Sequence, residues 1–257
     1  MTNPKDIKFA FFGSSLFSTY VIEELAAAGF EPALHITSAK EDLPIEQLKS
    51  LNADVFIVAS FGKILPQEII DLPRHGMLNI HPSLLPRLRG SSPIQNTILN
   101  KEEKTGVTII RMDEKMDHGP ILTQKVVEIE PWPDYYEVAE EKLGRAGGKL
   151  LAEVLPIWIN GEISAQEQDH TQATYTKLVK KEDGLIEEAE NDESKWRKVL
   201  AYSTWPKAHF FFTKKNGDSV RIVIRKAELV DGKFTPTKVI PEGKKEMDWQ
   251  DFLKGNA

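Results

Sequence analysis

Short apolar runs alternate with helix-like segments through the first half of this 257-residue chain. The run at residues 7–12 ends at Gly13, and the next segment carries Val21 and Leu25 on one helical face before Gly29 ends it. This βαβα order predicts an α/β fold, a mostly parallel sheet with helices on both faces. Further strands are expected at 33–37, 53–60, 76–80 and 106–112, and helices at 92–100 and 135–160, the last weakened by Gly147 and Gly148.

The second half has a different pattern. Residues 161–172 are polar and are predicted to link a first domain at 1–160 to a second domain at 173–257. Alternating apolar residues predict strands at 208–213, 219–226 and 234–240, and Asn216-Gly217 is typical of a hairpin turn. Short helices are expected at 193–203 and 248–253. We therefore expect a small β-barrel-like module, similar to an OB fold.

Composition excludes several classes of protein. The chain has no cysteine, which excludes disulfides, thiolate metal sites and cysteine nucleophiles. Its 40% hydrophobic and 28% charged residues are typical of a globular protein. The first residues run directly into the strand at 7–12 without a signal peptide or a long apolar run, so a cytoplasmic, soluble protein is expected. We expect it to be a monomer.

Charge is distributed unevenly in this acidic chain, whose net charge is -6. Residues 182–193 contain seven acidic and no basic residues, whereas residues 194–245 contain 13 Lys and Arg against 4 Asp and Glu, a net of +9. A basic segment of this kind indicates either a surface that binds a polyanion or a solvated face of a small β domain.

Three side chains with complementary chemistry lie at or after predicted strand ends. They are the carboxamide of Asn79, the imidazole of His81 and the carboxylate of Asp117. Acyl transfer to an amine requires a donor for the developing oxyanion, a group that exchanges protons near neutral pH, and a carboxylate that orients that group. In parallel α/β sheets ligands bind beyond the carboxyl ends of the strands, so this is where we expect the chemistry.

Two other interpretations can be weighed from the residues alone. The junction Gly13-Ser14-Ser15 has one glycine where a dinucleotide-binding loop needs three, so it indicates an N-cap or a site for an anionic or polar ligand end. His118 stands beside Asp117 and suggests a metal site shared with His81. Because no spaced histidine pair or further carboxylate cluster accompanies them, no metal is expected.

The segment Asn79-Ile-His-Pro-Ser-Leu-Leu-Pro86, continued by Arg89-Gly90, closely resembles the signature of the folate-dependent formyltransferases. Residues 105–119, which end in Asp117-His-Gly119, resemble its second half. The resemblance implies a Rossmann-like domain that uses 10-formyltetrahydrofolate, with Asn79, His81 and Asp117 as catalytic residues. It also implies folate contacts from Phe61, Gly62, Lys63, Ile64, Leu65, Ser83, Leu84, Leu85, Pro86, Met112, Asp113 and Met116.

Segments at 174–186, 201–206 and 241–253 resemble the C-terminal domain of the family members that formylate methionyl-tRNA. This resemblance implies that initiator methionyl-tRNA accepts the formyl group from the folate donor in translation initiation. Residues expected to contact that substrate are Gly13, Ser14, Ser15, Phe17, Lys40, Arg89, Lys214, Lys215, Lys244 and Lys245.

Two departures from the family pattern keep other functions open. The longer basic loop that these enzymes carry after the second strand is reduced here to Lys40, and the stretch between Val230 and Phe234 lacks a hairpin. The same chemistry on a nucleotide-linked amino sugar, or hydrolysis of the folate donor, are therefore alternatives. A non-catalytic RNA-binding protein is a third, which the intact Asn79, His81 and Asp117 argue against.

Overall fold

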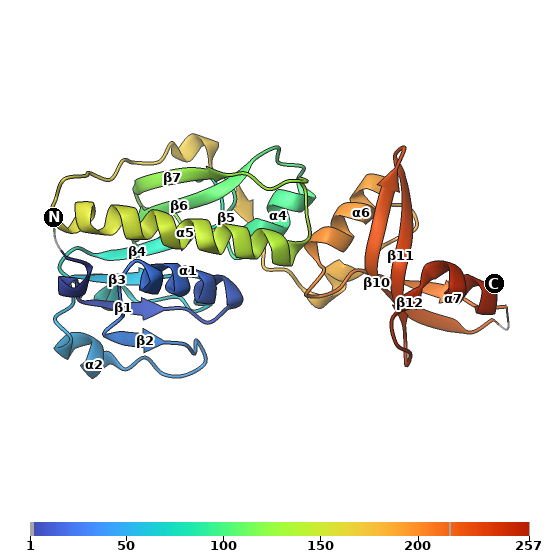
Figure 1. Ribbon diagram of the computed structural model, residues 1–257, viewed down its shortest axis with the longest axis horizontal. Helices are drawn as coiled ribbons and strands as arrows, with labels where there is room; N and C mark the ends of the chain where they lie inside the picture. The colour runs from blue at the N-terminus through green and yellow to red at the C-terminus, as the bar shows by residue number, and fades with distance from the viewer. Residues whose placement is uncertain (1–2, 216, 257) are drawn as a thin grey trace. The chain divides into compact units, whose positions relative to one another are not determined.

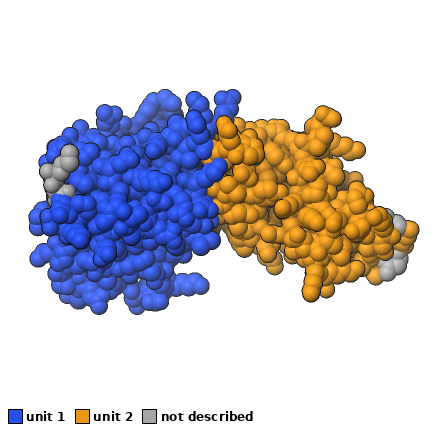
Figure 2. Space-filling model, viewed as in Figure 1, with its two compact units in different colours: residues 1–93, 103–128, 140–177 blue, residues 94–102, 129–139, 178–257 orange. Residues whose placement is uncertain are grey.

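The computed structural model describes residues 3–215 and 217–256, and the chain forms two compact units (Figures 1 and 2). Unit 1 holds the described parts of 1–93, 103–128 and 140–177, and unit 2 holds those of 94–102, 129–139 and 178–257. The segment 161–172, predicted as a linker, thus belongs to unit 1. The predicted domain boundaries stay a prediction.

Unit 1 is built on a six-stranded sheet, confirming the predicted α/β class. Four strands run parallel in the order β2-β1-β3-β4, and β6 and β7 continue the sheet in antiparallel pairing. A separate pair joins β5 and β8 in parallel. The strands are β1 (Phe9–Phe12), β2 (Leu34–Ile36), β3 (Val55–Val58), β4 (Met77–His81), β5 (Arg89–Gly90), β6 (Thr105–Arg111), β7 (Ile121–Val127) and β8 (Tyr175–Thr176).

Helices cover both faces of this sheet, as the alternating pattern predicted. One face carries α1 (Leu16–Ala27) and α5 (Tyr136–Ile159), which Figure 1 shows crossing in front of the strands. Side chains of α2 (Ile45–Ser50) and α3 (Gln67–Ile70) pack on the other face with alternate residues of β1 and β3 and with Met77 of β4. Short 3-10 helices lie at Pro4–Asp6, His170–Gln172 and Lys181–Gly184.

The glycines of α5 permit close packing instead of breaking the helix. A Cβ on Gly147 would lie 2.6 Å from the Ile80 side chain of β4, and one on Gly148 would lie 2.6 Å from the Val21 carbonyl of α1. Both distances are shorter than real Cβ contacts. The helix is therefore continuous, and these positions let it approach the strand that carries Asn79 and His81.

Unit 2 contains a four-stranded antiparallel sheet in the order β12-β11-β10-β9. Asp231 and Gly232, both with positive φ, join β10 directly to β11 in a two-residue turn. A tight hairpin therefore occupies the stretch between Val230 and Phe234, which was expected to lack one. Asn216 of the predicted hairpin turn lies outside the described residues. The elements are α4 (Pro93–Leu99), α6 (Asp192–Ala201), β9 (His209–Thr213), β10 (Ser219–Val230), β11 (Lys233–Pro241), β12 (Met247–Asp248) and α7 (Trp249–Asn256).

The aromatic residues of β9 divide between core and surface. Phe210 and Phe212 contact Trp249 of α7 edge-on, and Phe212 also contacts the buried Phe252. Phe211, on the other face of the strand, is exposed. The alternation of side chains along the strand thus explains why some of these aromatic residues are buried and another is exposed.

Among the helices of the described residues, none is long and apolar enough to cross a membrane.

Candidate active site

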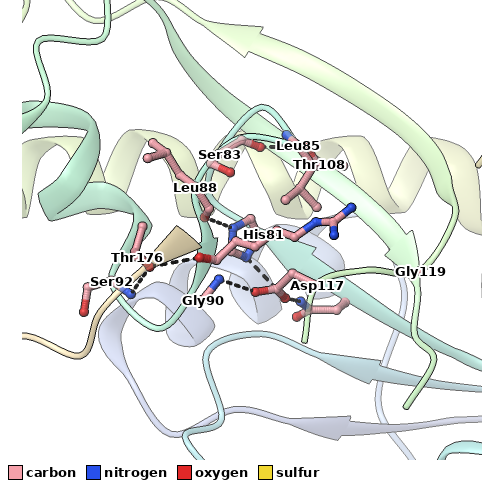
Figure 3. Close-up of polar contacts among 12 residues, drawn as sticks. His81, Ser83, Leu85, Leu88, Gly90, Ser92, Thr108, Asp117, Gly119 and Thr176 are labelled. Atoms are coloured by element: carbon pink, nitrogen blue, oxygen red, sulfur yellow. Dashed lines mark hydrogen bonds and ion pairs between the residues drawn. The ribbon is translucent and has the colours of Figure 1, made fainter. Parts of the chain in front are cut away.

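The carboxylate of Asp117 is the centre of the predicted catalytic group. Its Oδ1 accepts a hydrogen bond from Asn79 Nδ2 at 3.2 Å. Its Oδ2 accepts one from the backbone N–H of Gly90 at 2.7 Å (Figure 3). His81 Nδ1 lies 3.5 Å from Oδ1. The three residues predicted from the sequence therefore meet, and the Gly90 amide joins them.

His81 is enclosed on both sides of its ring. Its side chain is 4% exposed, and its Nε2 lies 2.9 Å from the Leu88 carbonyl oxygen. A carbonyl oxygen only accepts hydrogen bonds, so Nε2 carries a proton. With Asp117 beside Nδ1, each ring nitrogen of His81 faces an oxygen that can accept a hydrogen bond.

The loop after β4 is held by hydrogen bonds to side chains outside it. Thr108 of β6 donates its hydroxyl to the Ser83 carbonyl at 2.6 Å and accepts from the Leu85 backbone N–H at 3.1 Å. The Leu88 N–H donates to Thr174 Oγ1 at 2.8 Å, which fixes the carbonyl that faces His81. Thr108 and Thr174, which both lie outside the loop, thus hold it in place.

Gly90 reaches Asp117 because it lacks a side chain. Its φ is +111°, and a Cβ there would lie 2.7 Å from the Thr176 carbonyl oxygen of β8. Only glycine combines this conformation with this approach at low cost. The β5–β8 pair therefore presents the Gly90 N–H to the carboxylate.

The direction of β6 corrects one expectation. Asp117 was predicted to join Asn79 at a common carboxyl edge of parallel strands, but β6 is antiparallel to β4, with Arg111 opposite Leu78. The loop after β6 returns over the sheet face that carries Asn79 and His81. Its closure requires Gly119, where a Cβ would lie 1.9 Å from the Arg111 carbonyl oxygen.

A cavity of about 200 Å³ opens beside Asp117. Its walls come from the segment after β3 and from the loop after β6. Most of its lining is apolar, and Ile64 and Met116 are exposed. Six of the residues predicted to contact folate line it: Lys63, Ile64, Leu65, Met112, Asp113 and Met116.

The other predicted folate contacts lie elsewhere. Phe61 is buried in the core against Phe12, and Gly62 has a positive φ in the turn that precedes the cavity wall. Ser83 and Leu85 are buried within the loop after β4. That loop also contains Leu84, which packs against Gly106, and Pro86.

Predicted substrate residues are scattered. Gly13, Ser14 and Ser15 line a second cavity of about 410 Å³ together with His35, whose pKa burial lowers below its ordinary value. Phe17 is buried in the core, and Lys40 is exposed.

Arg89 faces the protein interior. It is 1% exposed, and its guanidinium donates to Gln168 Oε1 at 3.2 Å from Nε and 2.6 Å from Nη2. Nη2 also lies 2.9 Å from His170 Nδ1. Sequence patterns gave no signal for Gln168, which lies in the polar segment predicted as a linker.

His118, the residue that raised a metal interpretation, is engaged by protein groups. Its Nδ1 lies 2.7 Å from Asp113 Oδ2, and its ring stacks on that of His170 with 4.1 Å between centroids.

The four predicted lysines of unit 2 share one end of its sheet. Lys214 and Lys215 follow β9, and Lys244 and Lys245 follow β11. Thr213 pairs with Ser219 and Pro241 with Ile222, so both loops flank the start of β10.

Comparison with known proteins identifies the family of this chain. A family model described as formyl transferase matches residues 18–155. The methionyl-tRNA formyltransferase of Chloroflexus aggregans is 36% identical over 266 aligned residues, covering 91% of this chain and 85% of that enzyme. That of Thermotoga neapolitana is 44% identical over 191 residues, covering 74% of this chain and 60% of that enzyme.

Solved structures show the same fold. A methionyl-tRNA formyltransferase from Clostridium thermocellum superimposes with a TM-score of 0.69 at 18% identity, covering 94% of this chain and 99% of that chain. HypX from Aquifex aeolicus in complex with tetrahydrofolic acid gives 0.73 at 18% identity, covering 95% of this chain and 46% of that chain. Family match, sequence identity and fold agree that this chain belongs to the formyl transferase family and is a relative of the methionyl-tRNA formyltransferases.

Proposed function

We propose that this protein transfers the formyl group of 10-formyltetrahydrofolate to the α-amino group of initiator methionyl-tRNA. The observation that carries the proposal is the set of contacts at Asp117, which joins Asn79, His81 and the Gly90 amide at the wall of a cavity. The curated relatives support the choice of acceptor.

The cavity beside Asp117 suits the ring end of a folate. Its volume of about 200 Å³ is below the roughly 300–1,000 Å³ of sites that enclose a whole drug-sized ligand. Leu65, Ile110 and Met112 offer apolar walls for a flat ring. The exposed Ile64 and the cations of Lys63 and Lys115 would contact the remainder, which ends in carboxylates.

The proposed role of Asn79 is to stabilise the oxyanion that develops during formyl transfer. When bound, the folate supplies the formyl carbon that the amine attacks, and negative charge then develops on the formyl oxygen. The Asn79 carboxamide has two N–H groups, and one of them donates to Asp117. The second N–H has no partner among the residues that the structure describes. It can therefore donate to the developing oxyanion, where a donor contributes most in the transition state.

The proposed role of Asp117, supported by His81, is to transfer the proton that the attacking amine loses. As the new C–N bond forms and the bond from carbon to the folate nitrogen breaks, the amine loses a proton and the folate nitrogen gains one. Three carboxylates line the cavity, those of Asp113, Glu114 and Asp117, and Asp117 is the one in contact with Asn79 and His81. It is therefore placed to accept the amine proton and to pass it to the folate nitrogen. His81 lies behind it, with Nδ1 3.5 Å from Oδ1 of Asp117, and orients the carboxylate. No step requires a metal.

Unit 2 is proposed to contact the RNA. The lysines at 214, 215, 244 and 245 gather at one end of its sheet, and phosphate neutralisation by such residues supplies most sequence-independent affinity for nucleic acids.

The direct test is formyl transfer from 10-formyltetrahydrofolate to charged initiator methionyl-tRNA, with charged elongator methionyl-tRNA in parallel. Transfer to the initiator supports the proposal, and equal transfer to both locates weak discrimination at the short segment around Lys40. Two further assays run in parallel: formyl transfer to nucleotide-linked amino sugars, and hydrolysis of the folate donor without an acceptor. Turnover confined to either of these by folded protein would refute methionyl-tRNA as the acceptor.

A further inference from the structure

The carboxamide of Gln168 connects two parts of unit 1. Its Oε1 accepts two hydrogen bonds from Arg89, and its Nε2 donates to the backbone carbonyls of Asp117 at 2.9 Å and Gly119 at 2.7 Å. The side chain is 4% exposed, so solvent does not replace these partners. Both donors and both acceptor positions of the carboxamide are therefore used.

Arg89 is an unusual anchor for this connection. Its guanidinium is buried, and among the described residues its hydrogen-bond partners are neutral groups: Gln168, His170 and, at 3.3 Å, the Tyr175 hydroxyl. Burying a cation without a paired carboxylate costs free energy. Arg89 directly precedes Gly90, so its bonds to Gln168 connect that carboxamide to the residue whose N–H donates to Asp117.

Asp117 is held from two directions. The Gly90 N–H fixes its carboxylate, and Gln168 fixes its backbone carbonyl and that of Gly119. The backbone at Asp117 has φ +49°, a conformation that a residue other than glycine adopts at a cost and keeps only when its surroundings impose it. The hydrogen bonds from Gln168 and Gly90 hold Asp117 in this conformation.

We propose that Gln168 is a positioning residue, which sets the backbone of the Asp117 loop and so the place of the carboxylate between Asn79 and His81. This inference rests on the proposed formyl transfer for its kinetic consequence. It gives the segment after α5, which is far from the formyltransferase signature in sequence, a role in holding the backbone of the Asp117 loop.

Gln168→Glu separates the two sides of the connection. A carboxylate would keep two acceptors for Arg89, but it has no N–H for the carbonyls of Asp117 and Gly119 and would repel them. Gln166→Glu is the matched control, because Gln166 is exposed in the same segment and joins Ile121 only through its backbone N–H and carbonyl.

The first readout is hydrogen exchange of the peptide that covers residues 112–119. Gln168→Glu should raise exchange in this peptide, whereas Gln166→Glu should leave it unchanged. This measurement needs no substrate, so it tests Gln168 even if formyl transfer is not the reaction. Unchanged exchange in folded Gln168→Glu would overturn the proposal.

The second readout is a double-mutant cycle with Asp117→Asn. Gln168→Glu should lower kcat roughly 10- to 100-fold, because small misplacement of a reacting group has effects of this size. In the Asp117→Asn background the same change should cost about threefold or less, because its effect passes through the Asp117 carboxylate. A full additional loss in that background would contradict the assignment.

Should Gln168→Glu fail to fold, Gln168→Ala replaces it in both experiments, since the smaller side chain leaves room for water near Arg89. Activity equal to the unchanged protein in Gln168→Ala, with unchanged exchange at 112–119, would again overturn the proposal. If the protein without substitutions shows no formyl transfer, the result counts against the proposed function and leaves the role of Gln168 to the exchange measurement.

Discussion

The backbone N–H of Gly90 donates a 2.7 Å hydrogen bond to Oδ2 of Asp117. The two residues lie on β5 and on the loop after β6, so their contact ties the two halves of the sequence signature together. Gly90 occupies a backbone conformation with φ +111° against Thr176, which links the local demand for glycine to the geometry of the carboxylate.

Gly90→Ala should therefore lower stability and activity together. The added methyl group would meet the Thr176 carbonyl at 2.7 Å in a left-handed conformation, at an expected cost of roughly 1–3 kcal/mol in the free energy of unfolding. Urea unfolding measures the first effect and kcat the second. Gly161→Ala is the control, because Gly161 also has positive φ but a methyl group there would meet no atom within 4 Å. Equal effects at both glycines would show that the Thr176 contact is unimportant.

Asn79→Ala should lower kcat by about a hundredfold or more, since loss of one oxyanion donor typically costs roughly 2.7–4 kcal/mol in the transition state. The free energy of unfolding should change little in comparison, because Asp117 keeps its Gly90 partner. Steady-state kinetics with saturating donor provide the measurement, and Asn100→Ala, at an exposed position, is the control. A kcat within threefold of the unchanged protein would remove Asn79 from the chemistry.

Replacing Lys214, Lys215, Lys244 and Lys245 by Ala should weaken RNA binding and flatten its dependence on salt. Each lost phosphate contact reduces the slope of log K against log salt by about 0.9 for duplex and 0.7 for single strands. Binding of initiator tRNA from about 50 to 200 mM salt gives the slope. Lys5→Ala with Lys49→Ala, at exposed sites of unit 1, provides the control. An unaltered slope in the quadruple variant would exclude this end of the sheet from the interface.

Local patterns were sufficient for much of the fold. Apolar runs and helical spacing placed β1, β3, β4 and α5, and the Asn79-to-Pro86 segment identified the residues that meet at Asp117. These features depend on residues close in sequence. The direction of β6 does not, because the connection from β4 passes through β5 and α4, and the local pattern contains no record of which way the strand returns.

Arg89 and Gln168 illustrate what remains hidden in the sequence. A positive residue in a signature segment suggests a substrate contact, and a glutamine in a polar stretch suggests a linker. In the structure they are hydrogen-bonded to each other across 79 positions and are both buried. Such a pair is recognisable only once tertiary packing has removed both side chains from water.

His209 gives a prediction for stability against pH. Burial lowers its pKa, the nearby cations Arg221 and Lys181 lower it further, and the Lys207 carbonyl partly opposes them. In the unfolded chain, His209 has the ordinary histidine pKa of about 6.5. As the pH is lowered, the unfolded chain therefore binds a proton at this site at a higher pH than the folded protein does. Stability contributed at His209 is present above that pH and is lost as pH falls through it toward the folded pKa.

His209→Gln removes this titration. The free energy of unfolding of the unchanged protein should fall relative to that of the variant as the pH is lowered from about 7.5 to about 5, while their difference stays constant above about pH 7.5. Urea unfolding of both proteins at a series of pH values measures the difference. The pH-dependent contributions of the carboxylates that both proteins share cancel in this difference. A difference that does not vary with pH would show that His209 has the same proton affinity in the folded and unfolded chain. Its burial beside Arg221 and Lys181 would then have no energetic consequence.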